Sequence, residues 1–318
     1  MNGDMLSGST PQEQLQPANN PTKRRRILVT GGSGFLGAVL AENLALQHEV
    51  AFTYCNNKVQ LSRCKGMHMD ITRPETIAPV LRSFNPEVVI HAAAEPRGSI
   101  CQKNPELAQR VNLFGTERLM DALPRPDMPF IFLSTDLIFD GEKAPYHEES
   151  IPEPISLYGI SKMSAEQSVL QRGVSSIVLR AALIYGHMPG SGKGSFLQWM
   201  NNALSNRTPI KLFHDEYRTP VYALDIVRVV RALLEQHPPY QVFHIGGPER
   251  LNRVEFAEKL AAVHGYDPGL IMPVSLADLD TGYPRPRDVS LDTTRVQESL
   301  GIQLTPVEEA LWEIYGGF

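Results

Sequence analysis

The stretch Ile27-Leu28-Val29-Thr30-Gly31-Gly32-Ser33-Gly34-Phe35-Leu36-Gly37 decides the fold. It begins with a short apolar run that predicts a buried strand, and from about residue 34 to 46 the apolar residues recur at helical spacing. The glycines between them satisfy both G-x-x-G-x-x-G and, from Gly32, G-x-G-x-x-G. The stretch therefore predicts a strand, a tight glycine-rich turn and a helix, in that order.

A turn of this kind suits a dinucleotide. One glycine permits the tight bend, the next lets the backbone approach a pyrophosphate, and the last lets the helix pack close to the strand. The free N–H groups at the helix N-terminus favour phosphate charge. We predict that Gly31, Gly34, Phe35, Leu36 and Gly37 contact the dinucleotide, and a tight turn without a ligand is the alternative.

Strand and helix patterns alternate along the first half of the chain. Apolar runs predict strands at 27–29, 50–54, 88–90, 130–133 and 177–179, and helical spacing or proline predicts helices near 74–81, 105–123 and 156–170. Continuous apolar strands separated by helices indicate a parallel sheet covered on both faces. We expect an α/β fold, a Rossmann-type doubly wound parallel sheet, over residues 26–181.

The second half, residues 182–318, is expected to form a smaller substrate-binding region, with some strands returning to the Rossmann sheet. Helices are predicted near 196–204, 224–234, 253–263 and 306–315, and a glycine-rich loop at 187–194. The proline-rich stretch 283–287 resists helix and is expected to line a surface or cleft. Residues 1–25, poor in apolar periodicity, are predicted to be a disordered tail.

Composition limits the classes of function. The 318 residues are 42% hydrophobic and 20% charged, which is ordinary for a globular enzyme. No apolar run has transmembrane length, and no secretory signal is recognised. Three cysteines predict a reducing compartment, and a net charge of -5 gives no reason to expect nucleic acid. We expect a cytoplasmic protein without membrane, nucleic-acid or metal partners, because the nine histidines show no metal-ligand spacing.

The residues after the second strand bear on which dinucleotide binds. NAD sites place a carboxylate here for the ribose 2′-OH. This chain reads Tyr54-Cys55-Asn56-Asn57-Lys58, so asparagine donors and a lysine are available for a 2′-phosphate. NADP(H) is therefore predicted through Tyr54, Asn56, Asn57 and Lys58, with NAD(H) as the alternative.

Two further strand ends are candidates for the cofactor. Asp70, followed by Ile71, is placed to accept from an adenine amino group, and an Asp that caps the next helix is an equal alternative. The strand at 88–90 continues into His91 and then Ala92, Ala93 and Ala94, whose small side chains would let backbone lie against the cofactor. Alanines packed at a sheet edge are the alternative there.

A catalytic pair is predicted at Tyr158 and Lys162. They lie four residues apart in an expected helix, so they share one face. A neighbouring ammonium and an oxidised nicotinamide would lower the pKa of the phenol and let it exchange a proton with a carbonyl oxygen. Ser134-Thr135, at the end of a strand, adds a hydroxyl for the substrate oxygen.

These motifs together resemble the extended short-chain dehydrogenases/reductases: the glycine turn, the His-Ala-Ala-Ala stretch, Val111-Asn112-x-x-Gly115-Thr116, Ser134-Thr135-Asp136 and Tyr158-Gly159-x-Ser161-Lys162. The stretches at 134–141 and 285–292 narrow the resemblance to the dTDP-4-dehydrorhamnose reductase branch. That branch includes the regulatory β subunit of methionine adenosyltransferase. The likeness runs from about Arg26 to the C-terminus.

The resemblance implies roles for single residues. Thr135, Tyr158 and Lys162 would be catalytic, and Lys162 would also hold the nicotinamide ribose. Asn112 would lie beside the cofactor at the active-site helix, and Asp136 near the sugar. The substrate or its diphosphate would be bound by two arginines, Arg218 and Arg285, for which structural ion pairs are an equal alternative.

The resemblance implies an NADPH-dependent reductase of a keto group on a nucleotide-linked deoxysugar, with Tyr158 as proton donor. A non-catalytic NADP-binding regulatory subunit is the alternative, and an epimerase or dehydratase ranks third. Leu137 stands where the reductases have Tyr and where dehydratases carry an acid, and the segment 95–98 also departs from the reductase pattern. Both departures concern the substrate, which is expected to be a nucleotide sugar or a related small molecule. A homodimer remains open.

Overall fold

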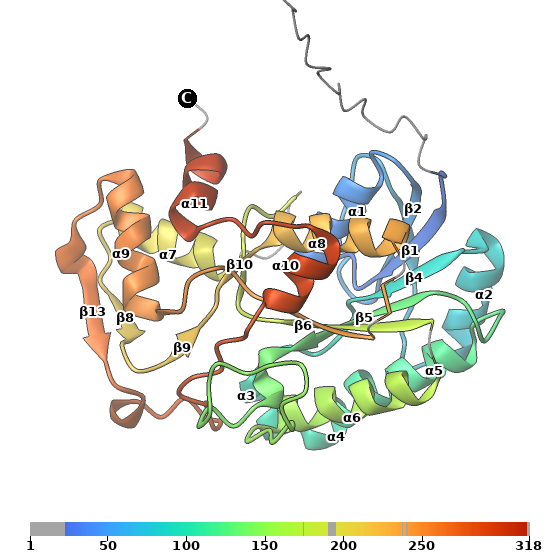
Figure 1. Cartoon of the computed structure of the whole chain (residues 1–318), viewed down its shortest axis with the longest axis horizontal. Helices are drawn as coiled ribbons and strands as arrows, with labels where there is room; N and C mark the ends of the chain where they lie inside the picture. The colour runs from blue at the N-terminus through green and yellow to red at the C-terminus, as the bar shows by residue number, and fades with distance from the viewer. Residues whose placement is uncertain (1–22, 174, 190–194, 237, 240, 317–318) are drawn as a thin grey trace, which may run out of the picture.

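The computed structural model describes residues 23–173, 175–189, 195–236, 238–239 and 241–316. Most of the tail predicted at 1–25 and the end of the loop predicted at 187–194 lie outside the described residues. Figure 1 shows a central sheet with helices on both faces and a second group of helices and short strands beside it.

The central sheet has seven strands in the order β11-β6-β5-β4-β1-β2-β3, and every neighbouring pair is parallel. The strands are β1 Arg26–Thr30, β2 Glu49–Tyr54, β3 Lys65–His68, β4 Val88–His91, β5 Phe130–Thr135, β6 Ser176–Ala181 and β11 Val242–Ile245. The strand order reverses between β1 and β4, and crevices at such switch points are where open α/β sheets bind ligands. The Rossmann-type α/β prediction is confirmed.

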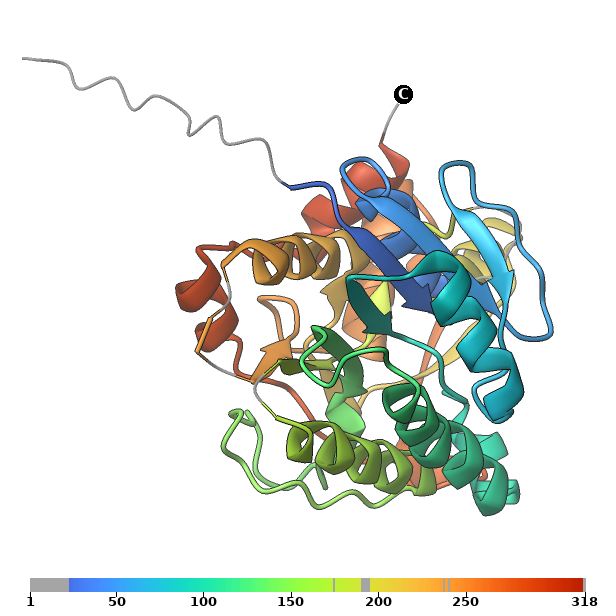
Figure 2. The same ribbon diagram turned by 90° about the vertical axis from the view of Figure 1, so that its right-hand side faces the viewer.

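Helices cover both faces of this sheet (Figures 1 and 2). One core joins the sheet to α1 Phe35–Leu44, α8 Ala223–Gln236 and α10 Thr294–Leu300. A second core, on the other face, joins it to α2 Pro74–Phe84, α5 Gly115–Asp121 and α6 Leu157–Gln171. Successive strand residues alternate between the two: Ile27 and Val29 lie in the first core and Leu28 in the second. Because both faces are covered, the inner strands are mostly apolar, whereas the edge strand β3 is largely exposed.

The segment predicted as one helix at 105–123 is divided into three. It contains α4 Pro105–Ala108, a π-helical turn η1 Gln109–Phe114 and α5, and a separate short helix α3 Gly98–Lys103 precedes it. Turns of this type are frequent at functional sites. The single-helix prediction is therefore corrected. A π-helical turn adds one residue to a helical turn, and the apolar periodicity of the sequence does not reveal it.

The second half has a core of its own besides the residues that it adds to the sheet. Helices α7 Phe196–Ser205, α9 Arg253–His264 and α11 Val307–Tyr315 enclose a core of their own. Three strand pairs accompany them: β8 Ile210–Phe213 with β13 Ile271–Val274, β9 Tyr217–Arg218 with β12 Leu251–Asn252, and β7 Ile184–Tyr185 with β10 Val221–Tyr222. Short 3₁₀ turns lie at η2 Asp136–Ile138, η3 Pro268–Leu270 and η4 Leu276–Asp278.

The C-terminal part returns to the first half through β11, which pairs with β6, and through α8 and α10, which pack on the sheet. The division after residue 181 stays a prediction. Within the described ranges, we find no helix that combines the length and the apolar character needed to cross a bilayer.

Candidate active site at the carboxyl ends of the sheet

The glycine turn lies tightly against the end of β4. Gly31 has a φ of +70°, and a Cβ there would lie 2.7 Å from the backbone N and Cα of Ala93. A Cβ on Gly37 would lie 2.3 Å from the Gly31 carbonyl oxygen, whereas one on Gly34 would meet only that oxygen, at 3.3 Å. The backbone therefore requires glycine at 31 and 37 and leaves space at 34, where α1 begins.

The alanines expected beside the cofactor are held against this turn by a buried polar chain. The Ala93 N–H donates to the Thr30 hydroxyl over 3.2 Å, and this hydroxyl lies 2.6 Å from Nδ1 of His91. The other ring nitrogen of His91 lies 2.9 Å from the Thr116 hydroxyl. Burial, together with the charge of Lys162, lowers the pKa of His91 to about 3, so it stays neutral at physiological pH. Ala92, Ala93 and Ala94 are all partly exposed.

The residues predicted for the adenosine end lie along the edge formed by β2 and β3. Tyr54 is partly buried at the end of β2, and Asn56, Asn57 and Lys58 follow it on the surface.

Asp70 and Ile71 follow β3. The Asp70 carboxylate accepts from the Thr72 N–H over 2.9 Å and from its hydroxyl over 2.7 Å, which closes a local turn. Arg73, and not Asp70, is the N-cap of α2, so the capping alternative is corrected.

The catalytic candidates meet where β5 ends and α6 begins. The Thr135 hydroxyl is a hydrogen-bond partner of the Tyr158 phenol, and it also donates to the Asp136 carboxylate over 3.2 Å. Ser156 caps α6 by accepting from the Gly159 N–H over 3.1 Å, which fixes the first turn that carries Tyr158. The structure thus brings Thr135, Asp136 and Tyr158 together.

The ionisation of the phenol differs from the expectation. Burial, and then the Asp136 carboxylate, raise the pKa of Tyr158, while its hydrogen bond with Thr135 opposes them. The sequence reasoning predicted a lowered pKa, because it considered the Lys162 ammonium and the nicotinamide without the burial. In this structure the phenol is firmly protonated at neutral pH.

Lys162 is buried on the same helix, with 3% of the residue exposed. Its Nζ donates to the Leu133 carbonyl over 2.7 Å and lies 3.9 Å from the centre of the Phe132 ring. Burial lowers the pKa of the amine to about 7, and the Glu166 carboxylate opposes that shift. Burial therefore brings the titration of this amine close to neutral pH.

Asn112 lies in the π-helical turn, buried beneath α6. Its side-chain oxygen accepts from the Glu95 N–H over 2.8 Å, and its amide donates to the Ser161 hydroxyl over 2.9 Å and to the Glu95 carbonyl over 3.2 Å. The side chain therefore fixes the segment that follows the alanines to the active-site helix. Its contact with the cofactor stays a prediction.

The two arginines predicted for the substrate converge with a residue that the sequence reasoning missed. Arg218 pairs with Asp136 over 2.7 Å and with Glu216 over 3.1 Å, and Arg285 pairs with Glu216 over 2.8 Å. Arg253 approaches the same carboxylate at 3.3 Å. Burial would raise the pKa of Glu216, but the three arginines lower it to about 2.

This arginine cluster, namely Arg218, Arg253 and Arg285 around Glu216 and Asp136, has three cations and two carboxylates. The ion-pair alternative for Arg218 and Arg285 is therefore observed. The Nε atoms of Arg218 and Arg285 and one Nη of Arg253 are buried without a hydrogen-bond partner among the described residues. A site that keeps spare N–H donors and surplus positive charge is suited to an anion.

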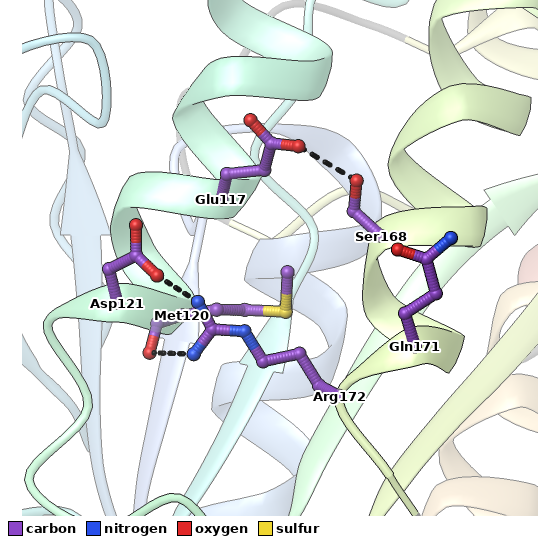
Figure 3. A pocket seen from close by; sticks show the side chains of 6 residues that line it. All are labelled: Glu117, Met120, Asp121, Ser168, Gln171 and Arg172. Carbon is purple, nitrogen blue, oxygen red and sulfur yellow. Dashed lines mark hydrogen bonds and ion pairs between the residues drawn. The ribbon is translucent and has the colours of Figure 1, made fainter.

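A surface pocket between α5 and α6 lies apart from this site (Figure 3). Ser168 donates to Glu117 over 2.8 Å, and Arg172 pairs with Asp121 and with the Met120 carbonyl. Ser168 and Arg172 lie at the C-terminal end of α6, whereas Tyr158 and Lys162 lie in its first turns. The pocket contains none of the predicted site residues.

Comparison with known proteins agrees with this geometry. The family model described as the RmlD substrate binding domain matches residues 25–317, which is nearly the whole chain. The chain belongs to this family. The resemblance to the dTDP-4-dehydrorhamnose reductase branch is thereby confirmed.

Its relatives within the branch include different kinds of protein. One relative is a probable low-salt glycan biosynthesis reductase, Agl14, of Haloferax volcanii, 32% identical over 91% of this chain and 97% of its own length. Another is methionine adenosyltransferase 2 subunit beta of Bos taurus, which is 28% identical over 91% of this chain and 87% of its own length. The crystal structure of dTDP-4-dehydrorhamnose reductase from Bacillus anthracis, in complex with NADP, shares the fold with a TM-score of 0.81 at 23% identity, over 93% of this chain and 100% of that one.

Proposed function

We propose that this protein is an NADPH-dependent reductase of a keto group on a nucleotide-linked deoxysugar. The arrangement of Thr135, Tyr158 and Lys162 at the end of β5 carries the proposal. Bound NADPH would supply hydride to the carbonyl carbon. Tyr158 donates its phenolic proton to the carbonyl oxygen, Thr135 hydrogen-bonds that oxygen, and Lys162 binds the nicotinamide ribose as an ammonium.

The protonated state of Tyr158 is compatible with the reductive direction. A group that gives a proton in the reaction must carry one beforehand, as a phenol does at neutral pH, although burial and Asp136 raise its pKa and make it a weaker acid in the protein without cofactor. The arginine cluster supports the substrate class. Arg218, whose Nε has no partner among the described residues, pairs with Asp136, the residue that follows Thr135. Arg218 and Arg285 would donate to a diphosphate while the sugar reaches the hydroxyls.

The cofactor preference rests on the adenosine end. Lys58 is exposed beyond β2, and Asn56 and Asn57 precede it. No carboxylate stands in the stretch Tyr54–Lys58 to accept from a ribose 2′-OH. A 2′-phosphate would gain charge-assisted hydrogen bonds there. We therefore propose NADPH over NADH.

The similarity to methionine adenosyltransferase 2 subunit beta favours a second function. The chain is 28% identical to that subunit and 32% identical to the glycan biosynthesis reductase Agl14. In this alternative the chain binds NADP(H) as a non-catalytic subunit of a methionine adenosyltransferase. The same residues would then hold the dinucleotide without a keto-sugar turnover.

One assay separates the two functions. The assay uses a panel of nucleotide-linked 4-keto-deoxysugars. Oxidation of NADPH and of NADH is followed by the loss of absorbance of the reduced nicotinamide. The reductase proposal predicts turnover that is lost in Tyr158→Phe, while NADPH binding changes less than about threefold, because only the transferred proton is removed. Absence of turnover in the wild type, combined with co-purification of a methionine adenosyltransferase, would establish the regulatory alternative instead.

A further inference from the structure

Three consecutive residues of β5 are each held by a different residue of α6. The Leu133 carbonyl accepts from Lys162 over 2.7 Å, the Ser134 hydroxyl donates to Glu166 over 2.8 Å, and Thr135 hydrogen-bonds the Tyr158 phenol. The three helix residues are spaced four apart, so they form one row along α6, in which Lys162 and Glu166 are buried and Tyr158 is partly exposed. The Ser134–Glu166 contact is the part of this row to which the proposed reaction assigns no role.

Glu166 is also the anchor of a buried cation. Its carboxylate accepts from Nε of Arg180 over 3.0 Å and from an Nη over 2.5 Å, and the two side chains are 3% and 5% exposed. Arg180, on β6, pairs with no other carboxylate among the described residues. Its remaining Nη donates to the Glu148 backbone carbonyl over 3.0 Å and lies 3.2 Å from His244.

The other titratable groups around this row cannot replace the charge of Glu166. His91, from β4, and His244, from β11, are both neutral at pH 7, because burial lowers the pKa of each to about 3. The Glu148 carboxylate accepts from the His244 backbone N–H over 2.9 Å and faces Arg295. Among the described residues, Glu166 is therefore the one carboxylate that pairs with Arg180, and its charge also opposes the lowering of the Lys162 pKa.

We propose that Glu166 is a positioning residue that holds the end of β5 in register with α6 and places a negative charge one helical turn from the Lys162 amine. Its consequence for catalysis rests on the proposed function, but its effect on Lys162 is a property of the protein without ligands. The electrostatics agree in sign: burial lowers the pKa of Lys162 to about 7, and Glu166 opposes the lowering. Without that carboxylate, Arg180 would also become an uncompensated neighbouring cation.

The direct test measures the titration of Lys162 in the ligand-free protein. Lysine is labelled with ¹³C at Cε, and the Lys162 signal is assigned by its loss in Lys162→Arg. In Glu166→Gln we expect the titration midpoint to fall by about one pH unit or more, so that the charged fraction at pH 7 drops from about one half to below about a tenth. An unchanged midpoint would overturn the proposal, whether or not the protein is a reductase.

The control is a second glutamate–serine contact of α6, which Ser168 makes with Glu117 of α5. Glu117 accepts from Ser168 over 2.8 Å in the surface pocket, away from the site (Figure 3). Glu117→Gln removes a carboxylate from a hydrogen bond of the same length, and we expect it to leave the Lys162 midpoint within about 0.3 pH units. A shift in this control equal to that in Glu166→Gln would show that the effect is not specific to Glu166.

The functional arm uses NADPH binding and turnover. In Glu166→Gln the NADPH affinity at pH 7 is expected to fall about fivefold, following the charged fraction of Lys162, and to recover when the pH is lowered to 5.5. A merely structural role would lower the NADPH affinity equally at both pH values.

Glu166→Asp keeps the charge but withdraws it from Ser134, so it should lower kcat while shifting the Lys162 titration midpoint by less than about 0.5 pH units. Wild-type kcat in that variant would refute the positioning role even if Glu166→Gln did not fold.

Discussion

Replacing Lys162 by Met should stabilise the protein while disabling its site. The pKa of the amine falls from 10.5 to about 7 on folding, and 3.5 units correspond to about 5 kcal/mol that burial of the ammonium costs below pH 7. Methionine fills similar space without charge. It leaves the Leu133 carbonyl, which now accepts from Nζ over 2.7 Å, without its donor, at a cost of about 1–2 kcal/mol. The expected net gain at pH 6 is therefore about 3 kcal/mol.

The pH dependence identifies the cause. Between pH 7 and 10.5 the unfolded wild type binds a proton that the native state has lost, so wild-type stability rises with pH in this window. At pH 9 the pH lies only about 1.5 units below the pKa of the unfolded-state lysine, so burial of the amine costs less. The stability advantage of Lys162→Met over the wild type should therefore be about 2–3 kcal/mol smaller than at pH 6. Urea unfolding at pH 6 and pH 9 measures both values, with Lys211→Met, at an exposed lysine, as the control. A difference between variant and wild type that is equal at both pH values would refute the reasoning.

Two further variants test the backbone and the charges of the site. Gly31→Ala should lower the free energy of unfolding by about 2 kcal/mol or more and abolish NADPH binding, because φ is +70° and the Cβ meets the Ala93 backbone at 2.7 Å. Gly34→Ala is the control: its Cβ makes one contact, at 3.3 Å, and it should lower the free energy of unfolding by less than about 1 kcal/mol. Equal urea midpoints for the two variants would contradict this prediction. Glu216→Gln should cost about 3–5 kcal/mol, because the buried arginines lose their shared carboxylate. A wild-type thermal midpoint for that variant would show that water or solvent ions already compensate these charges.

The parts of the fold that the sequence predicted depend on local patterns. Most of the predicted helices end within about two residues of their observed bounds, because caps such as Ser156 and the apolar periodicity are both readable in one segment. The mini-sheet of β8 and β13 was not predicted. Its strands are four residues long, lie about sixty residues apart and include the exposed Met272, so neither carries a buried apolar run.

The candidate site divides in the same way. The glycine turn and the Tyr158–Lys162 spacing are local and were found, whereas the arginine cluster is assembled across 82 residues from Asp136 to Arg218 and 69 from Glu216 to Arg285. Sequence spacing cannot predict such pairs. Glu166 had a usable signal, because it follows Lys162 by four residues on the same helical face. The sign of the Tyr158 pKa shift also needed the structure, since burial exceeds the nearby charges.

The two proposed catalytic groups show how burial acts on a phenol and on an amine in the same site. Burial disfavours both the phenolate of Tyr158 and the ammonium of Lys162, so the phenol keeps its proton and the amine becomes easy to discharge. A protonated phenol suits donation to a carbonyl oxygen, but the amine would lose its charge at the pH where it is needed to bind a ribose. The Glu166 carboxylate, one turn further along α6, opposes only the second effect. Under the proposed function, the place of Glu166 in the row therefore favours keeping both the acid and the cation that the reductive step would use.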